Sequence, residues 1–174
     1  MNTFARIKPI AAYEKVRYYS IVLGDDEDSL FEHFIAVQQG EHPKKLNHIL
    51  AWIRVIGEKY GAQEYLFRSE AFGADASALP PKGKHREPVY IEYGKKSANA
   101  LRLYTFRINE RVVFLFDGAL KTAATAQNCP NVSAHFKMAN ILTAAIQTAL
   151  EEQDLRWEED FSDINYDENF TLSL

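Results

Sequence analysis

The chain contains a single cysteine, Cys129, among its 174 residues. One thiol excludes an intrachain disulfide framework and is typical of a reducing compartment, so we expect a cytoplasmic protein. The N-terminus lacks a continuous apolar segment, which argues against a secretory signal. No apolar run approaches the roughly 18 residues that a membrane-spanning helix needs, so we expect no membrane association.

Recognisable catalytic and cofactor motifs are also missing. The sequence has no glycine-rich phosphate loop of the nucleotide-binding type and no G-x-S-x-G serine motif. His42 and His48 are six residues apart and fall on different helix faces, and the pair Cys129 and His135 has no accompanying ligands. The sequence therefore predicts no metal and no cofactor.

Charge is distributed unevenly, which the net charge of −4 conceals. Residues 154–174 carry seven acidic side chains against Arg156 alone, a balance of −6, which leaves +2 for the other 153 residues. Residues 82–111 hold eight lysines and arginines against three acidic residues. This asymmetry predicts a basic working surface and an acidic C-terminal segment. The alternative is a solvated face followed by a disordered end.

Hydrophobic patterning predicts an α/β (α+β) fold: a small, mostly antiparallel sheet with an N-terminal helical hairpin and a C-terminal helix. We expect a main domain over residues 1–153 and an acidic extension over 154–174. The elements predicted in the main domain are a strand at 14–23, two helices between 30 and 60, a long loop at 67–87, a strand at 88–93, a hairpin at 101–116 and a helix at 131–152.

The hairpin around residues 100–122 is the most informative segment. Alternation places Arg102, Tyr104, Phe106 and Ile108 on one face of its first strand. The apolar run at 112–116 is typical of a strand covered on both faces. An arginine and a tyrosine on one face, followed by a lysine at a neighbouring strand end, favour a phosphate-binding surface. The alternative is a hairpin whose arginines are merely solvated.

Three segments carry a resemblance to a known family. They read IGEKYGAQEYLFRSE, PVYIEY and LRLYTFRINERVVFLFDGALKT. Together with the element order, they resemble the RelE/ParE superfamily of bacterial toxins, nearer its HigB-like branch, over about residues 15–150. The resemblance implies a RelE-like fold and a toxin that acts on mRNA as a metal-free endoribonuclease, with or without the ribosome. It also implies an antitoxin partner, which we expect to be a helix-turn-helix protein.

The resemblance also implies roles for particular residues. Arg102 and Lys121 would hold the scissile phosphate while the RNA 2′-hydroxyl attacks it, and Tyr104 or His135 would move the proton. The predicted catalytic residues are therefore Arg102, Lys121, Tyr104 and His135. The predicted RNA-binding residues are Lys82, Lys84, His85, Arg86 and Arg107.

Departures from the family pattern keep other functions open. Lys121 stands alone where the family has a pair of lysines, and Tyr104 and His135 match the expected proton-transfer residue by chemistry and not by motif. The alternative function is a non-catalytic RelE-like protein that binds a protein partner or nucleic acid, and a mobile-element accessory protein is a third possibility. The acidic segment could lie across the basic face as an internal phosphate mimic. The sequence leaves the oligomeric state open.

Overall fold

The computed structural model describes residues 4–71, 73–123 and 129–174. The strands of its main sheet are β1 (Phe4–Ala12), β2 (Arg17–Leu23), β3 (Arg68–Ser69), β4 (Ser77–Leu79), β7 (Leu101–Arg107), β8 (Val112–Leu120) and β11 (Leu172–Ser173). Its helices are α1 (Leu30–Glu41), α2 (Pro43–Val55) and α3 (Pro130–Glu151), with a π-helical turn η1 (Ile56–Tyr60) and a 3-10 turn η2 (Glu64–Leu66). Two smaller ribbons pair β5 (Tyr90–Glu92) with β6 (Lys95–Ser97) and β9 (Arg156–Trp157) with β10 (Ile164–Asn165).

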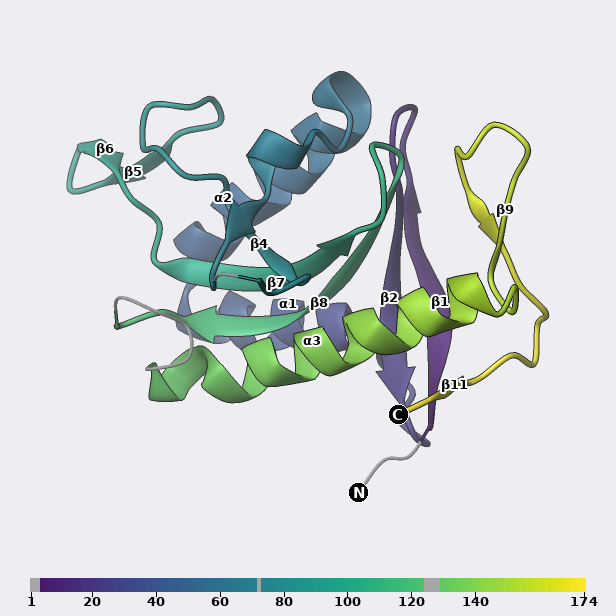
Figure 1. Cartoon of the computed structure of the whole chain (residues 1–174). Helices are drawn as coiled ribbons and strands as arrows, with labels where there is room; N and C mark the ends of the chain where they lie inside the picture. Colours follow the sequence, from purple (N-terminus) through teal and green to yellow (C-terminus); the bar gives the residue numbers. More distant parts are fainter. Residues whose placement is uncertain (1–3, 72, 124–128) are drawn as a thin grey trace.

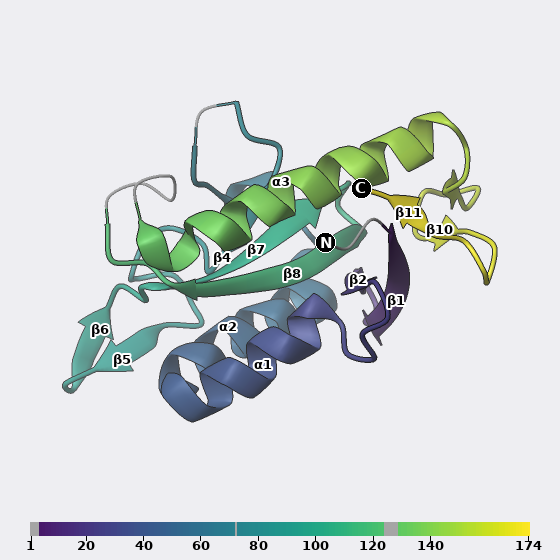
Figure 2. The same ribbon diagram turned by 90° about the horizontal axis from the view of Figure 1, so that it is seen from below.

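The main sheet lies between two layers of helix. Its strand order is β11-β1-β2-β8-β7-β4-β3, and every pairing is antiparallel except the parallel contact between β2 and β8. Figure 2 shows α3 on one face of β7 and β8 and α1 with α2 on the other. The expectation of a mixed α/β fold with a mostly antiparallel sheet is therefore confirmed.

The two central strands, β7 and β8, supply side chains to both cores. Because successive side chains of a strand point to opposite faces, Leu103 packs toward α1 and α2 while Tyr104 packs toward α3. Every residue of β8 from Val112 to Phe116 is at most 1% exposed, so the predicted two-sided burial of this run is confirmed. The remaining β7 and β8 residues on the α1–α2 side are Leu101, Val113 and Leu115, and those on the α3 side are Phe106, Val112, Phe114 and Phe116.

The helix α1 begins with a capping box at Ser29. The Ser29 hydroxyl accepts a hydrogen bond from the Glu32 amide at 3.1 Å, and the Glu32 carboxylate accepts one from the Ser29 amide at 3.0 Å. Lys8 on β1 adds an ion pair to Glu32 at 2.7 Å. This reciprocal bonding gives partners to two backbone amides at the start of α1, which would otherwise have none within the helix.

Strands near the predicted loop differ from the sequence-based expectation. Residues 88–93 were expected to join the sheet, but their β5 pairs with β6 in a ribbon that projects away from it (Figure 1). The third strand beside β7 is instead β4, from within the predicted loop. Ala78 and Leu79 of β4 are fully buried, whereas Ile91 of β5 is 48% exposed. Small apolar residues that pack against β7 therefore decide which segment enters the sheet.

The two ends of the chain also differ from expectation. The residues before position 14, where no strand was predicted, form β1, which pairs with β2 along most of its length. The acidic segment at 154–174 is packed and not simply solvated, because Leu155, Ile164 and Leu172 enter the core beneath α3. Its last strand, β11, pairs with β1, so this segment completes the sheet edge.

Candidate functional site

The candidate site lies at the end of the sheet where β7 begins and β8 ends. Arg102 pairs with Ala119 across the two strands, and the Lys121 amide donates to the Ala100 carbonyl at 2.8 Å. Arg102 alternates with Leu101 and Leu103, which face α1 and α2, so its side chain lies on the α3 side of the sheet. Strand pairing thus brings together the two cations that the sequence predicted as phosphate contacts.

A carboxylate that the sequence reasoning missed occupies the space between these cations. Arg102 Nε donates to Glu70 Oε1 at 2.8 Å, and Lys121 Nζ contacts Glu70 Oε2. The side chains are nearly inaccessible: 2% exposed for Glu70, 10% for Arg102 and 11% for Lys121. A second Arg102 nitrogen, Nη1, donates to the Asn99 carbonyl at 2.6 Å. The predicted pair is therefore formed but is closed by an internal anion.

Arg68 adds a third positive charge next to this contact. Its Nε donates to the Pro80 carbonyl at 2.9 Å and its Nη2 to the Pro81 carbonyl at 3.2 Å. Burial, together with the charge of Arg102, lowers the pKa of Arg68 to about 10, so its guanidinium remains protonated at neutral pH. Arg68, Arg102 and Lys121, here called the basic cluster, face the single negative charge of Glu70. The cluster and its carboxylate together keep a net charge of +2.

Tyr104 is beneath α3 and out of reach of solvent. Its side chain is 0% exposed and packs against the Phe136 ring at a centroid distance of 5.3 Å. Burial, reinforced by the charge of Glu70, raises the pKa of Tyr104 well above its ordinary value, so the hydroxyl stays neutral. Among the described residues, this hydroxyl has no hydrogen-bond partner. In this structure the buried Tyr104 hydroxyl is out of reach of an RNA phosphate, which the predicted proton transfer would require.

His135 faces a different side chain from the one that the prediction requires. Its Nδ1 lies 3.7 Å from Asp117 Oδ2, beyond hydrogen-bonding distance, and the two side chains are 37% and 16% exposed. The pKa of Asp117 is raised, because the effect of burial outweighs the opposing effects of the Gly118 amide, His135 and His33. In the part of the chain that the structure describes, no contact joins His135 to the basic cluster. The four predicted catalytic residues therefore do not converge.

The predicted RNA-binding loop is exposed and adjoins the basic cluster. Lys82, Lys84, His85 and Arg86 are all exposed, and the Arg86 guanidinium lies 5.4 Å from the centre of the Tyr65 ring. A small cavity of about 30 Å³ is lined by Lys84 and Arg86 of this loop and by Arg68 of the cluster. The loop and the cluster thus form one continuous basic region.

Arg107, the other predicted RNA contact, lies elsewhere. It donates to the Ala62 carbonyl near η1, on the opposite face of the sheet from Arg102. Five residues of strand separate the two arginines, which corresponds to about 17 Å. Because five is an odd number, alternation also sends the two side chains to opposite faces. Arg107 is therefore not part of the basic region.

The only cysteine of the chain lies close to the same end of the sheet. Cys129 precedes the first turn of α3 and is fully buried, and its sulfur accepts a hydrogen bond from the Thr122 amide at 3.2 Å. Contacts from the Thr122 hydroxyl and from backbone amides lower the pKa of Cys129 to about 7. The buried thiol is thus held by contacts with Thr122, which follows β8.

The acidic segment does not cover the basic cluster. Its Asp163 accepts a hydrogen bond from the Tyr19 hydroxyl and lies 4.0 Å from Arg17 Nε. This segment follows the C-terminal end of α3, whereas the cluster lies near the N-terminal end (Figure 1), and a helix of 22 residues is about 33 Å long. The acidic segment therefore does not lie across the basic cluster as an internal phosphate mimic, and the carboxylate that pairs with Arg102 and Lys121 is Glu70.

Residues 4–71, 73–123 and 129–174 contain no group of three or more histidine, cysteine, aspartate or glutamate side chains placed to hold a metal ion. They also contain no helix whose length and apolar character would let it cross a membrane. In comparisons with known proteins, no family model, no curated protein and no solved structure matches this chain.

Proposed function

We propose that this chain is a RelE-like protein that binds RNA at its basic region without cleaving it. The observation that carries the proposal is the net positive charge of the basic cluster. A small cavity lined by Arg68 on one side and by Lys84 and Arg86 on the other joins this cluster to the exposed loop at 82–86. Backbone phosphates are the groups that clustered lysines and arginines bind in nucleic acids. The flanking Tyr65 ring, already stacked under Arg86, offers an aromatic surface for an unpaired base.

The element order supports the RelE-like part of the proposal. The strand β2 is followed by α1 and α2, then by the sheet strands β4, β7 and β8, and finally by α3. This is the order of a strand, two helices, three strands and a helix on which the resemblance rests. The strand β4 stands where the resemblance expects PVYIEY, whose strand β5 lies outside the main sheet, so that segment does not support the RelE-like part. The strands β1 and β11 are additions to the order.

Three features favour binding over cleavage. The phosphate contacts Arg102 and Lys121 are occupied by Glu70, and a proton-transfer group must lie within hydrogen-bonding reach of the reacting atoms. Tyr104 is buried, and His135 faces Asp117. RNA therefore meets the exposed loop first, and a phosphate reaches Arg102 only when the Glu70 carboxylate withdraws.

Cleavage of RNA by the same residues is the second candidate function. The observation that favours it is the convergence of Arg102 and Lys121 on one carboxylate, since a phosphate could take the place of that carboxylate. In this form the chain is the toxin of a toxin–antitoxin pair and acts in the cytoplasm on mRNA. Inducible expression should then arrest growth, and Arg102→Ala should abolish the arrest.

Fluorescence anisotropy with a labelled single-stranded RNA tests the binding proposal. The double variant Lys84→Glu with Arg86→Glu should weaken binding about tenfold or more at low salt and reduce the salt dependence by about one unit per lost contact. The double variant Lys44→Glu with Lys59→Glu changes the charge equally at exposed lysines outside the basic region and serves as the control. Equal losses in both variants would contradict a specific basic region.

The same samples separate the two candidate functions. Intact RNA after prolonged incubation, as judged on a denaturing gel, agrees with the non-catalytic proposal. RNA fragments that disappear with Arg102→Ala support the endoribonuclease instead. Fragments that persist in that variant indicate a contaminating nuclease, and binding is then measured on repurified protein.

A further inference from the structure

The outer side of α3 carries a stripe of small and uncharged residues with one charge at each end. No charged residue occurs from Met138 to Leu150. The spacing of four, three, one, three and four residues keeps the stripe on one side of the helix. The α3 stripe consists of Lys137, Ile141, Ala144, Ala145, Thr148 and Glu152.

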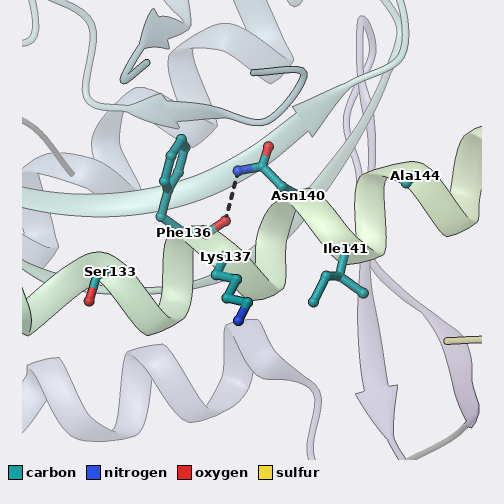
Figure 3. Close-up of a pocket in the computed structure, with 6 residues that line it drawn as sticks. All are labelled: Ser133, Phe136, Lys137, Asn140, Ile141 and Ala144. Atoms are coloured by element: carbon teal, nitrogen blue, oxygen red, sulfur yellow. Dashed lines mark hydrogen bonds between the residues drawn. The ribbon is translucent and has the colours of Figure 1, made fainter. Parts of the chain in front are cut away.

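This stripe is exposed along α3, and its residues from Ile141 to Glu152 also border a hollow of about 320 Å³ whose other wall includes residues 170–174. Five of its side chains are exposed and Ala145 is half-exposed, and Ile141 alone has 41% of its surface accessible. Figure 3 shows Lys137 and Ile141 projecting to one side of the helix, away from Phe136 and Asn140. A hollow of about 580 Å³ runs along this part of α3 and is lined only by α3 residues. An uncharged helix side of this length normally has a partner, because solvated helix surfaces carry charges.

The stripe is complementary to itself when it is reversed. Counted outward from the point between Ala144 and Ala145, the paired positions are two alanines, then two β-branched residues, and finally two residues of opposite charge. In an antiparallel helix pair related by a two-fold axis through that point, such positions face each other. The facing pairs are Lys137 with Glu152, Ile141 with Thr148, and Ala144 with Ala145.

We propose that two copies of this chain associate through antiparallel packing of their α3 stripes. The alanines lie at the crossing point, where their small side chains let the two backbones approach to about 8 Å. Two-fold symmetry places the ammonium of Lys137 beside the carboxylate of Glu152 twice, once at each end of the interface.

The two-fold complementarity of the stripe favours a second copy over an unrelated helix. A different partner requires complementarity only between its own surface and the stripe, and not between the two halves of the stripe. One helix pair buries less than the roughly 800 Å² per partner of a standard interface, so the dimer is weak and reversible. This interface goes beyond the proposed RNA binding, because none of the stripe residues belongs to the basic region.

Sedimentation velocity over a wide concentration range tests the proposal on the full chain. The sedimentation coefficient should rise from that of a monomer to that of a dimer, and Ala144→Arg should raise the dissociation constant about tenfold or more, since it places two bulky charges at the crossing point. Ala36→Arg makes the same change at an exposed position of α1, on the other side of the sheet, and should leave the dissociation constant unchanged. A monomer at every concentration, or a dimer unaffected by Ala144→Arg, overturns the proposal.

Charge reversal tests the antiparallel register. Lys137→Glu or Glu152→Lys alone should raise the dissociation constant about fivefold, because each single change sets like charges against each other at both ends. The double reversal should restore the affinity of the unchanged chain. The two residues are about 22 Å apart along one helix, so rescue cannot arise within a single chain. Loss in both single variants without rescue in the double variant overturns this register, provided that circular dichroism shows all variants folded.

Discussion

Ion pairs lie near both ends of α3, and they differ in how deeply they are buried. Near the N-terminal end, Arg102 and Lys121 share a carboxylate that is only 2% exposed, so water barely screens the contact. Near the C-terminal end, Arg17 and Asp163 lie 4.0 Å apart with side chains 37% and 34% exposed, so water and salt weaken their attraction. A buried excess of positive charge favours any anion that can reach it. For this reason the proposed RNA binding is placed at the first end and not at the second.

Removal of the Glu70 charge should have the largest effect. Glu70→Gln leaves Arg102 and Lys121 buried without an anion, so the free energy of unfolding in urea should fall by about 3–5 kcal/mol. Asp163→Asn, at the exposed end, should cost less than about 1 kcal/mol. Comparable losses in the two variants would show that burial does not distinguish the two ends.

A ligand measurement sharpens the same comparison. Inorganic phosphate should raise the melting temperature of Glu70→Gln more than that of the unchanged chain, because phosphate can replace the missing carboxylate between the cations. RNA should also bind the variant more tightly. An identical phosphate response in both proteins would mean that Glu70 does not occupy an anion site.

A side chain added at Gly118, where β7 and β8 approach closely, should have the next largest effect on stability. Gly118 lies opposite Leu103, and a Cβ on Gly118 would be 1.8 Å from the Arg102 carbonyl oxygen. Gly118→Ala should therefore lower the free energy of unfolding by about 2–3 kcal/mol and weaken RNA binding, since it displaces the strand that carries Arg102. Gly40→Ala in α1 has nothing within 4 Å of the added carbon and should stabilise by about 0.5–1 kcal/mol. Tolerance of Gly118→Ala would show that the two strands separate easily.

Loss of a tyrosine hydroxyl should affect stability differently near the two ends of α3, at Tyr104 and at Tyr19. Tyr104→Phe removes a buried hydroxyl that lacks a partner among the described residues, so the free energy of unfolding should stay level or rise by up to about 1 kcal/mol. Tyr19→Phe removes the hydrogen bond to Asp163 and should cost about 1–2 kcal/mol. If the unchanged chain cuts RNA and Tyr104→Phe cuts it at the same rate, a proton-transfer role for Tyr104 is excluded.

The smallest expected effect is a pH dependence at Cys129. Hydrogen bonds from Thr122 hold the folded-state pKa of this thiol at about 7, below its ordinary value of 9.0. A lowered pKa stabilises the fold above pH 9.0, and this contribution is lost as the pH falls through about 7. The stability difference between the unchanged chain and Cys129→Ser should therefore grow as the pH rises across this interval. A difference that is flat with pH would show that the thiol remains protonated.

Local patterns in the sequence were sufficient to predict the central elements. The apolar run that became β8, the alternation that placed Arg102 and Tyr104 on one face, and the helical spacing of α3 are properties of neighbouring residues. They led to the correct class of fold and to the pairing of Arg102 with Lys121. The exposed basic loop also followed from composition alone.

Only the tertiary structure decided what closes the site. Glu70 is 32 residues from Arg102 and 51 from Lys121, and it lies in a segment that the sequence predicted as a loop. Alternation tells which face a side chain occupies, but it says nothing about which distant group will cover that face. The choice of β4 over β5 as a sheet strand and the packing of the acidic segment beside β1 were decided in the same way. Each depends on the competition among distant segments for the same buried surface, and this competition is settled only when the chain folds.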